Sequence, residues 1–298
     1  MSSRPQEIEE HTNLWVLHPI SHRLAALLAR TSLQPNVVSF TGIVFGLMAA
    51  VAYHQFRAEG AAWIGFGCMV IWHLLDGVDG QLARLTGRSS TTGKVIDGFA
   101  DYTVYLAVYV ALAAALAPEM GGWVIGVVVL SAASHVLQAA ALERERETYF
   151  FWVYSGEAGK SPAVAEMPKN PILFGLYFGY LKIQNFLDRS EAVKQHGFDL
   201  AIGPNRRALA AERYKALYAD HVRRWWMLSA NTHTFSIFLF TVFGQPFYYF
   251  LFEIFILNGI FLLLLADKRR RDRDFMAWLA ALPKAGGAGA AAASVRGV

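Results

Sequence analysis

Six apolar blocks of about 20 residues constrain the fold of this chain more than any other feature of its sequence. A helix of that length crosses the hydrocarbon core of a bilayer, whereas a transmembrane β-strand is about half as long and alternates in polarity. Of the 298 residues, 55% are hydrophobic and only 17% are charged, which is unusual for a water-soluble domain. The sequence therefore predicts an all-α integral membrane protein with about six transmembrane helices. The blocks lie at 37–56, 61–82, 95–117, 121–142, 227–243 and 247–266.

The distribution of basic residues predicts how these helices are oriented. If the N-terminus is cytoplasmic, the outer loops are 57–60, 118–122 and 244–246, and they hold one basic residue, Arg57, of the 27 in the chain. Basic residues concentrate on the cytoplasmic side of membrane proteins. The pattern predicts that both termini and the active site are cytoplasmic. It also explains the pI of about 9.1 without nucleic acid as a partner.

Three segments lie outside the spans. Residues 12–30 have the pattern of an amphipathic helix at the membrane surface, interrupted by Pro19. An apolar piece at 172–186, inside a long polar insertion, reads as interfacial or re-entrant. An Ala/Gly-rich tail follows Pro283, and we expect it to be disordered. The predicted organisation is an N-terminal part, four spans with an acidic motif, a cytoplasmic or interfacial insertion, two further spans and a basic tail, with boundaries at 1–35, 36–142, 143–225, 226–267 and 268–298.

Four aspartates at the membrane edge carry the strongest chemical signal. Asp76 and Asp79 are three residues apart at the end of the second span, and Asp97 and Asp101 are four apart at the start of the third. Helical spacing of three or four places each pair on one face, and the short polar connection lets the two pairs face each other. Clustered carboxylates at membrane depth are costly unless cations neutralise them. Two divalent cations would cancel the four negative charges, and oxygen ligands favour Mg²⁺ or Mn²⁺. Paired cations of this kind support phosphoryl transfer.

Small residues and an arginine accompany the first acidic pair. Gly77, Gly80 and Ala83 recur every three residues, which suits either close helix packing or the approach of a ligand to the backbone. Arg84 lies one turn beyond Gly80, where its guanidinium could hold a phosphate. Solvated loop acids at the water boundary are the alternative reading of the aspartates, and the spacing disfavours it.

The stretch 76–101 resembles the signature of the CDP-alcohol phosphotransferase family, D-x2-D-G-x2-A-R-x(7–8)-G-x3-D-x3-D. All eight fixed positions match, and they are filled by Asp76, Asp79, Gly80, Ala83, Arg84, Gly93, Asp97 and Asp101. The segment from Pro35 to Ser39 is similar to the Pro-Asn-x-x-Ser/Thr element that often precedes the first span in this family.

The resemblance implies transfer of a substituted phosphate from a CDP-linked donor to an alcohol acceptor, with release of CMP, in phospholipid or related lipid synthesis. By the same resemblance the four aspartates are metal ligands, and Asp101 is also the base that accepts the acceptor hydroxyl proton. The resemblance further implies a homodimer and membrane lipids as partners. It assigns the CDP site to Asn36, Ser39, Gly80, Ala83, Arg84 and Gly93, with Gly93 in the turn beside that site.

The donor and the acceptor stay open. The favoured form is CDP-diacylglycerol with a polar alcohol, and the alternative is a soluble CDP-alcohol with a lipid acceptor such as diacylglycerol or ceramide. Arginines could bind a phosphorylated acceptor, but Arg144 and Arg146 alternate with glutamates, which favours a solvated helix face. His135, inside the fourth span, reads more simply as a packed histidine. The other acceptor candidates are Arg223, Arg224, Asn231, Thr232 and His233.

Two other protein classes use similar residues. A membrane prenyltransferase binds a diphosphate through aspartate pairs and Mg²⁺, but its two motifs usually lie in separate halves of a longer bundle. An ion-coupled transporter more often shows repeated halves with broken helices near the midplane. Here both acidic pairs lie within 26 residues and no half repeats another, so both classes are disfavoured.

Overall fold

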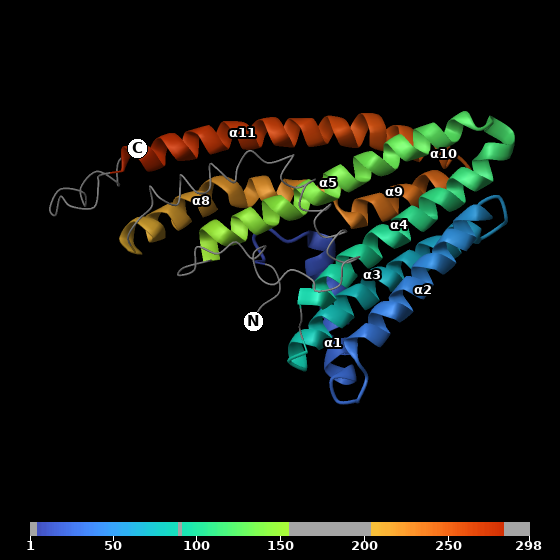
Figure 1. Ribbon diagram of the computed structural model, residues 1–298, viewed down its shortest axis with the longest axis horizontal. Coiled ribbons are helices and arrows are strands. Elements are labelled where there is room, and N and C mark those ends of the chain that lie inside the picture. The colour runs from blue at the N-terminus through green and yellow to red at the C-terminus, as the bar shows by residue number, and fades with distance from the viewer. Residues whose placement is uncertain (1–4, 89–90, 155–203, 283–298) are drawn as a thin grey trace.

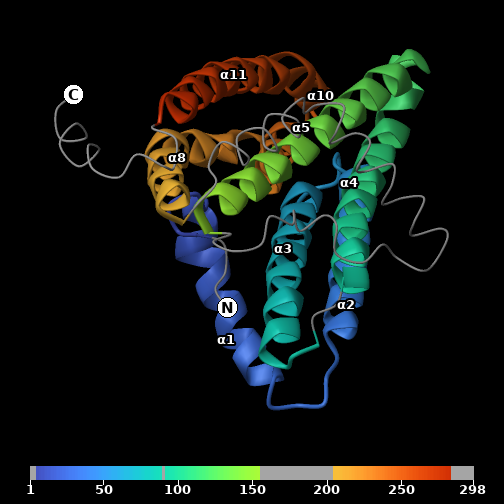
Figure 2. The same ribbon diagram turned by 60° about the vertical axis from the view of Figure 1, so that its left-hand side comes forward.

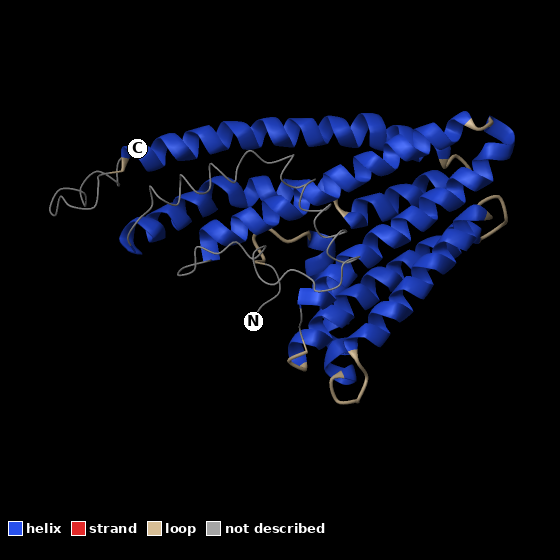
Figure 3. Ribbon diagram, in the orientation of Figure 1, coloured by secondary structure: helices blue, strands red, loops and turns tan. Residues whose placement is uncertain are grey.

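The computed structural model describes residues 5–88, 91–154 and 204–282, with the backbone alone for 91–99 and 204–205. Every element in these ranges is helical, as Figure 3 shows. In chain order they are η1 (Asn13–Leu17), α1 (His18–Leu28), α2 (Pro35–His54), α3 (Ala61–Leu85), α4 (Thr91–Met120), α5 (Trp123–Tyr154), α8 (Pro204–Arg224), η3 (Trp225–Leu228), α9 (Ala230–Val242), α10 (Phe247–Leu251), η4 (Phe252–Leu257) and α11 (Asn258–Ala281). The all-α fold predicted from the sequence is confirmed.

Five helical runs are long and apolar enough to cross a membrane. They are Pro35–His54, Ala61–Leu85, Ala100–Met120, Trp123–Tyr154 and the continuous run Phe247–Ala281. Their windows are only 33–50% buried, so large apolar side chains such as Phe40, Leu106 and Leu263 face outward. Outward apolar surface of this extent suits lipid rather than water. The chain is therefore a multi-pass membrane protein.

The predicted span at 227–243 differs from the structure. Its helix, α9, has 13 residues, which corresponds to about 20 Å and is shorter than the hydrocarbon core. The 3-10 turn η3 and Ser229 precede it, and the positive-φ Gly244 follows it. The turn chemistry at both ends thus shortens the fifth helix below the length of its neighbours.

The helices form two arms that diverge from the end of the molecule where α10 lies (Figures 1 and 2). In one arm α2 packs against both α3 and α4, and α1 packs against α3. In the other arm α8 packs against α5 and α11. α5 and α11 each run without a break from the apolar region into this second arm.

Close approach within the first arm depends on glycine. A Cβ added at Gly46 of α2 would overlap the side chain of Val104 on α4, and one at Gly65 of α3 would lie 2.8 Å from the ring of Tyr53. Val104 and Tyr53 are fully buried in the main apolar core. These two glycines therefore set the separation of α2 from its neighbours.

The N-terminal segment connects the two arms. Glu10 accepts hydrogen bonds from Arg146 of α5 at 2.7 Å and from Ser229 and Asn231 at 3.0 and 2.9 Å, before the chain enters η1 and α1. Burial alone would raise the pKa of Glu7, but hydrogen bonds from Tyr154 and Lys215 lower that pKa to about 2. Two glutamates thus anchor the start of the chain to the second arm.

The predicted amphipathic helix is present, but Pro19 does not interrupt it. The π-helical turn η1 leads directly into α1, and Pro19 lies in the first turn of α1. A proline lacks the N–H that a regular helix would need, and the wider π turn just before it takes up that irregularity. Ser21 then donates a hydrogen bond to the carbonyl of Leu74 on α3, at 3.1 Å.

The second arm has its own apolar core. Tyr214 and Tyr218 of α8 stack with ring centroids 3.9 Å apart and pack with Phe275 of α11 and Tyr149 of α5. The basic run after the last span lies on α11, where buried Lys268 pairs with Asp272 at 2.7 Å. This run therefore stabilises the arm as well as carrying charge. The predictions for 172–186 and for the tail from 283 lie outside the described residues.

Candidate active site

The site begins where α2 meets α3. α2 starts at Pro35, whose missing N–H costs nothing in a first helical turn. One turn later Ser39 donates a hydrogen bond to Asp79 of α3, which is only 4% exposed, and the Ser39 Oγ also lies 3.2 Å from the carbonyl oxygen of Pro35. The Pro-Asn-Val-Val-Ser element and the aspartate motif, far apart in the sequence, are therefore in direct contact.

A ring contact between α3 and α4 shows how the two acidic pairs are placed. Trp72 and Tyr105 meet edge to face, with centroids 5.5 Å apart. Asp76 lies four residues after Trp72 and Asp101 four residues before Tyr105, so each is one turn from this contact on its own helix. Because α3 and α4 are antiparallel, going from Trp72 to Asp76 and going from Tyr105 to Asp101 both lead toward the same end of the helix pair. Asp76 and Asp101, both half-buried, lie toward the same end and on the facing sides of the two helices.

The small residues of α3 divide into two roles. A Cβ at Gly77 would lie 2.7 Å from Oγ of Ser21 on α1, so Gly77 permits helix packing. A Cβ at Gly80 would meet only the guanidinium of Arg84, at 3.6 Å, among the described atoms. Arg84 itself is exposed. The packing alternative therefore applies to Gly77, whereas the space over Gly80 is bordered by Arg84.

The structure describes the other predicted site residues in less detail. Asn36 is exposed in the first turn of α2, and Ala83 is half-buried on α3. Gly93 and Asp97 lie in the first turns of α4, where only the backbone is described. Gly93 is therefore part of the helix and not of the turn, because α4 begins at Thr91, four residues earlier than the predicted span.

Comparison with known families identifies the family that carries this arrangement of residues. Residues 32–175 match the family model described as CDP-alcohol phosphatidyltransferase. The chain belongs to the CDP-alcohol phosphatidyltransferase family. A comparison with curated proteins found no match. The matched range includes all eight signature residues and the Ser39–Asp79 contact. Membership of this family makes the protein a transferase of phosphate-containing groups.

The arginines considered for the acceptor of this CDP-alcohol phosphatidyltransferase have partners in the structure. Arg144 is 4% exposed and Arg146 pairs with Glu10, so the predicted solvated helix face is wrong. The face is buried because α5 continues into the second arm and the N-terminal segment covers it. Arg223 and Arg224 are exposed, and both pair with Asp220 at 2.7 Å.

Sequence reasoning missed one polar residue of this transferase. Glu253, in the middle of an apolar run, is fully buried between His135 of α5 and His233 of α9. Its Oε1 lies 3.4 Å from Nδ1 of each histidine. A single acid inside an otherwise apolar span was the available signal, since such residues are rare and usually functional.

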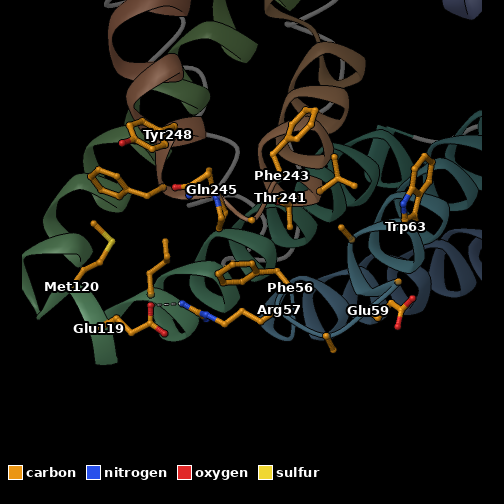
Figure 4. Close-up of a pocket in the computed structure, with 18 residues that line it drawn as sticks. Phe56, Arg57, Glu59, Trp63, Glu119, Met120, Thr241, Phe243, Gln245 and Tyr248 are labelled. Carbon is orange, nitrogen blue, oxygen red and sulfur yellow. Dashed lines mark ion pairs between the residues drawn. The ribbon is translucent and has the colours of Figure 1, made fainter.

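A pocket lies at the opposite end of the transferase from the aspartates. It has a volume of about 860 Å³ and is formed by the turns after α2, α4 and α9 (Figure 4). Arg57 and Glu119 pair across it at 2.7 Å, and both are exposed. None of the predicted site residues lines this pocket, so it plays no part in the candidate active site.

Proposed function

We propose that this transferase moves a substituted phosphate from a CDP-linked donor to an alcohol acceptor and releases CMP. The observation that carries the proposal is the hydrogen bond from Ser39 to the buried Asp79, on the helix that also carries Asp76. The family match supports this class over a prenyltransferase or a transporter.

The residues at this site fit divalent cations. Asp76, Asp79 and Asp101 offer carboxylate oxygens from two facing helices, and we propose Asp97 as the fourth ligand. An all-carboxylate set suits Mg²⁺ or Mn²⁺, and a ligand set for zinc would contain nitrogen or sulfur. Two such cations would offset the charge of the diphosphate and of the leaving CMP.

The protein's own groups would perform the remaining tasks. The Ser39 hydroxyl donates a hydrogen bond to one oxygen of Asp79, which fixes the orientation of that carboxylate. Arg84 above Gly80 is placed to hold a donor phosphate, with Asn36 on the adjacent first turn of α2. Asp101 would accept the proton of the acceptor hydroxyl, whose oxygen forms a bond to the phosphorus distal to cytidine as the bond to CMP breaks.

A substrate panel tests the function. The purified protein in liposomes is given CDP-diacylglycerol with polar alcohols, or soluble CDP-alcohols with diacylglycerol or ceramide, and CMP is measured with Mg²⁺, with Mn²⁺ and with EDTA. We expect CMP in the first arm, activity in either metal and none in EDTA. CMP in the second arm alone would reverse the assignment of donor and acceptor. Release of diphosphate would indicate a prenyltransferase.

Orientation and assembly are further parts of the proposal. We propose that both termini and the aspartates face the cytoplasm, because only Arg57 of the basic residues lies in the predicted outer loops. Labelling of single cysteines in intact cells would test this. A homodimer is expected from the family resemblance, and cross-linking in native membranes would detect it.

Arg84→Ala should raise the apparent KM for the CDP donor with a smaller change in kcat. The guanidinium provides a bidentate, charge-assisted contact to phosphate, and a contact made equally in the ground state and the transition state is lost as substrate binding. We expect a rise of roughly 10- to 100-fold, on the order of the 1.5–3 kcal/mol of one charged hydrogen bond. Steady-state kinetics with varied donor measure it, with Arg88→Ala, an exposed arginine beyond the helix, as the control. An unchanged donor KM would remove Arg84 from the CDP site.

A further inference from the structure

A buried polar cluster lies inside the apolar region, apart from the aspartates. It consists of His135 on α5, His233 on α9 and Glu253 on η4, with side chains 7%, 1% and 0% exposed. One ligand atom from each lies within 4.8 Å of those from the other two. Three ionisable groups in such a place are costly unless another group satisfies them.

The hydrogen bonds around Glu253 leave one of its oxygens available. Oε2 accepts hydrogen bonds from Tyr109, at 2.6 Å, and from Ser131. Oε1 has no hydrogen-bond partner among the described residues, and the same holds for Nδ1 of His135 and Nε2 of His233. Outer hydrogen bonds that fix one carboxylate oxygen and free the other are typical of metal ligands.

One distance in the cluster fits a tetrahedral metal. With bonds of about 2.0–2.1 Å and tetrahedral angles, neighbouring ligand atoms lie about 3.4 Å apart. Glu253 Oε1 is 3.4 Å from Nδ1 of His135, and neither atom has a hydrogen-bond partner among the described residues. Nδ1 of His233 instead contacts Tyr249 Oη at 2.9 Å, so Nε2 is the nitrogen that His233 offers to a metal.

The local backbone is also unusual at this point. Glu253 lies in the π-helical turn Phe252–Leu257, between two regular helices. π turns interrupt the regular hydrogen-bond ladder and occur frequently at functional sites. Here the turn carries Glu253 toward the histidines of α5 and α9.

We propose that His135, His233 and Glu253 bind one zinc-class divalent cation. Two imidazoles and one carboxylate are a common protein ligand set for Zn²⁺, whereas Mg²⁺ prefers oxygen alone. Tyr249 Oη, 2.9 Å from Nδ1 of His233, orients the imidazole of that ligand. A hydroxide at the fourth position would cancel the remaining positive charge. The ion would link α5, α9 and η4. It would lie at a level in the bundle that is one to two helical turns along α4 from Asp101.

Metal analysis of the purified protein tests this site directly. The protein carries a tag without histidine, is purified in mild detergent and is analysed by mass spectrometry for zinc after dialysis with and without added Zn²⁺. We expect about one zinc per chain in the wild type. We expect the same in Asp79→Asn, which alters only the carboxylate site, and in His73→Asn, which removes a nearby histidine bonded to Thr234.

The ligand variants give the opposite result. His135→Asn and His233→Asn should each lower the zinc content at least tenfold. Cobalt added to the metal-free wild type should produce visible absorption bands of a tetrahedral site that are absent from both variants. Chelation of zinc should lower the unfolding temperature of the wild type.

Two outcomes would overturn the proposal. One is a wild type that holds less than a tenth of an equivalent of zinc after incubation and gives no cobalt spectrum. The other is zinc retained by both histidine variants. If a variant does not fold, the wild-type measurements decide alone, and none of them depends on the transfer reaction.

Discussion

Asp101→Asn should abolish CMP release while the protein stays folded. The amide cannot accept the acceptor hydroxyl proton, and it removes one negative charge from the proposed cation site. A general base alone contributes about 10²–10⁴-fold, and we expect a loss at the upper end of that range or beyond. Initial rates of CMP formation from the CDP donor measure the effect in liposomes.

The control for Asp101→Asn is Asp274→Asn, an exposed acid on α11 outside the proposed site. Its rate should equal that of the wild type. Both variants should elute as the wild type does in size-exclusion chromatography and keep its unfolding temperature within a few degrees. Turnover by Asp101→Asn at the wild-type rate would remove Asp101 from the mechanism.

Glu10→Ala should destabilise the protein by about 3 kcal/mol, because it leaves Arg146 with less compensation for its buried charge. The side chains of Glu10 and Arg146 are 7% and 10% exposed, and the carboxylate also accepts from Ser229 and Asn231. A second carboxylate, Glu143, remains 3.7 Å from Arg146 and limits the loss. Denaturant unfolding in mild detergent gives the free energy of unfolding.

The chain offers a matched control in the exposed pair of Arg57 and Glu119. Their ion pair has the same 2.7 Å length as the one between Arg146 and Glu10, but its side chains are 46% and 64% exposed. Arg57→Ala should therefore cost no more than about 1 kcal/mol. If Glu10→Ala cost as little as Arg57→Ala, the N-terminal segment would not hold the two arms together.

Much of the candidate active site could be predicted from local spacing. Asp76, Asp79, Gly80, Ala83 and Arg84 lie on one helix, whose period fixes their relative placement without any tertiary contact. The polar connection between α3 and α4 is short, so the second acidic pair had to return to the same end. The apolar blocks likewise predicted α2, α3, α4, α5 and the run from α10 to α11.

Other features depended on contacts between distant segments. The polar-looking alternation around Arg144 and Arg146 became buried because α5 extends beyond the apolar region and meets the N-terminal segment. The shortness of α9 followed from the turns that flank it and not from its hydropathy. The gap of over one hundred residues between His135 and Glu253 concealed their contact, since no periodic pattern links them.

The sequence by itself determined that this chain spans a membrane with helices, because hydropathy is a local property. Its motif at 76–101 and the family match identified a family of phosphate-group transferases. Only the tertiary structure decided that Ser39 holds Asp79, that Gly77 serves packing while Gly80 lies under Arg84, and that two histidines and a glutamate meet inside the apolar core. Those results depend on which helix faces which neighbour, and that choice is made by the packing of the whole chain.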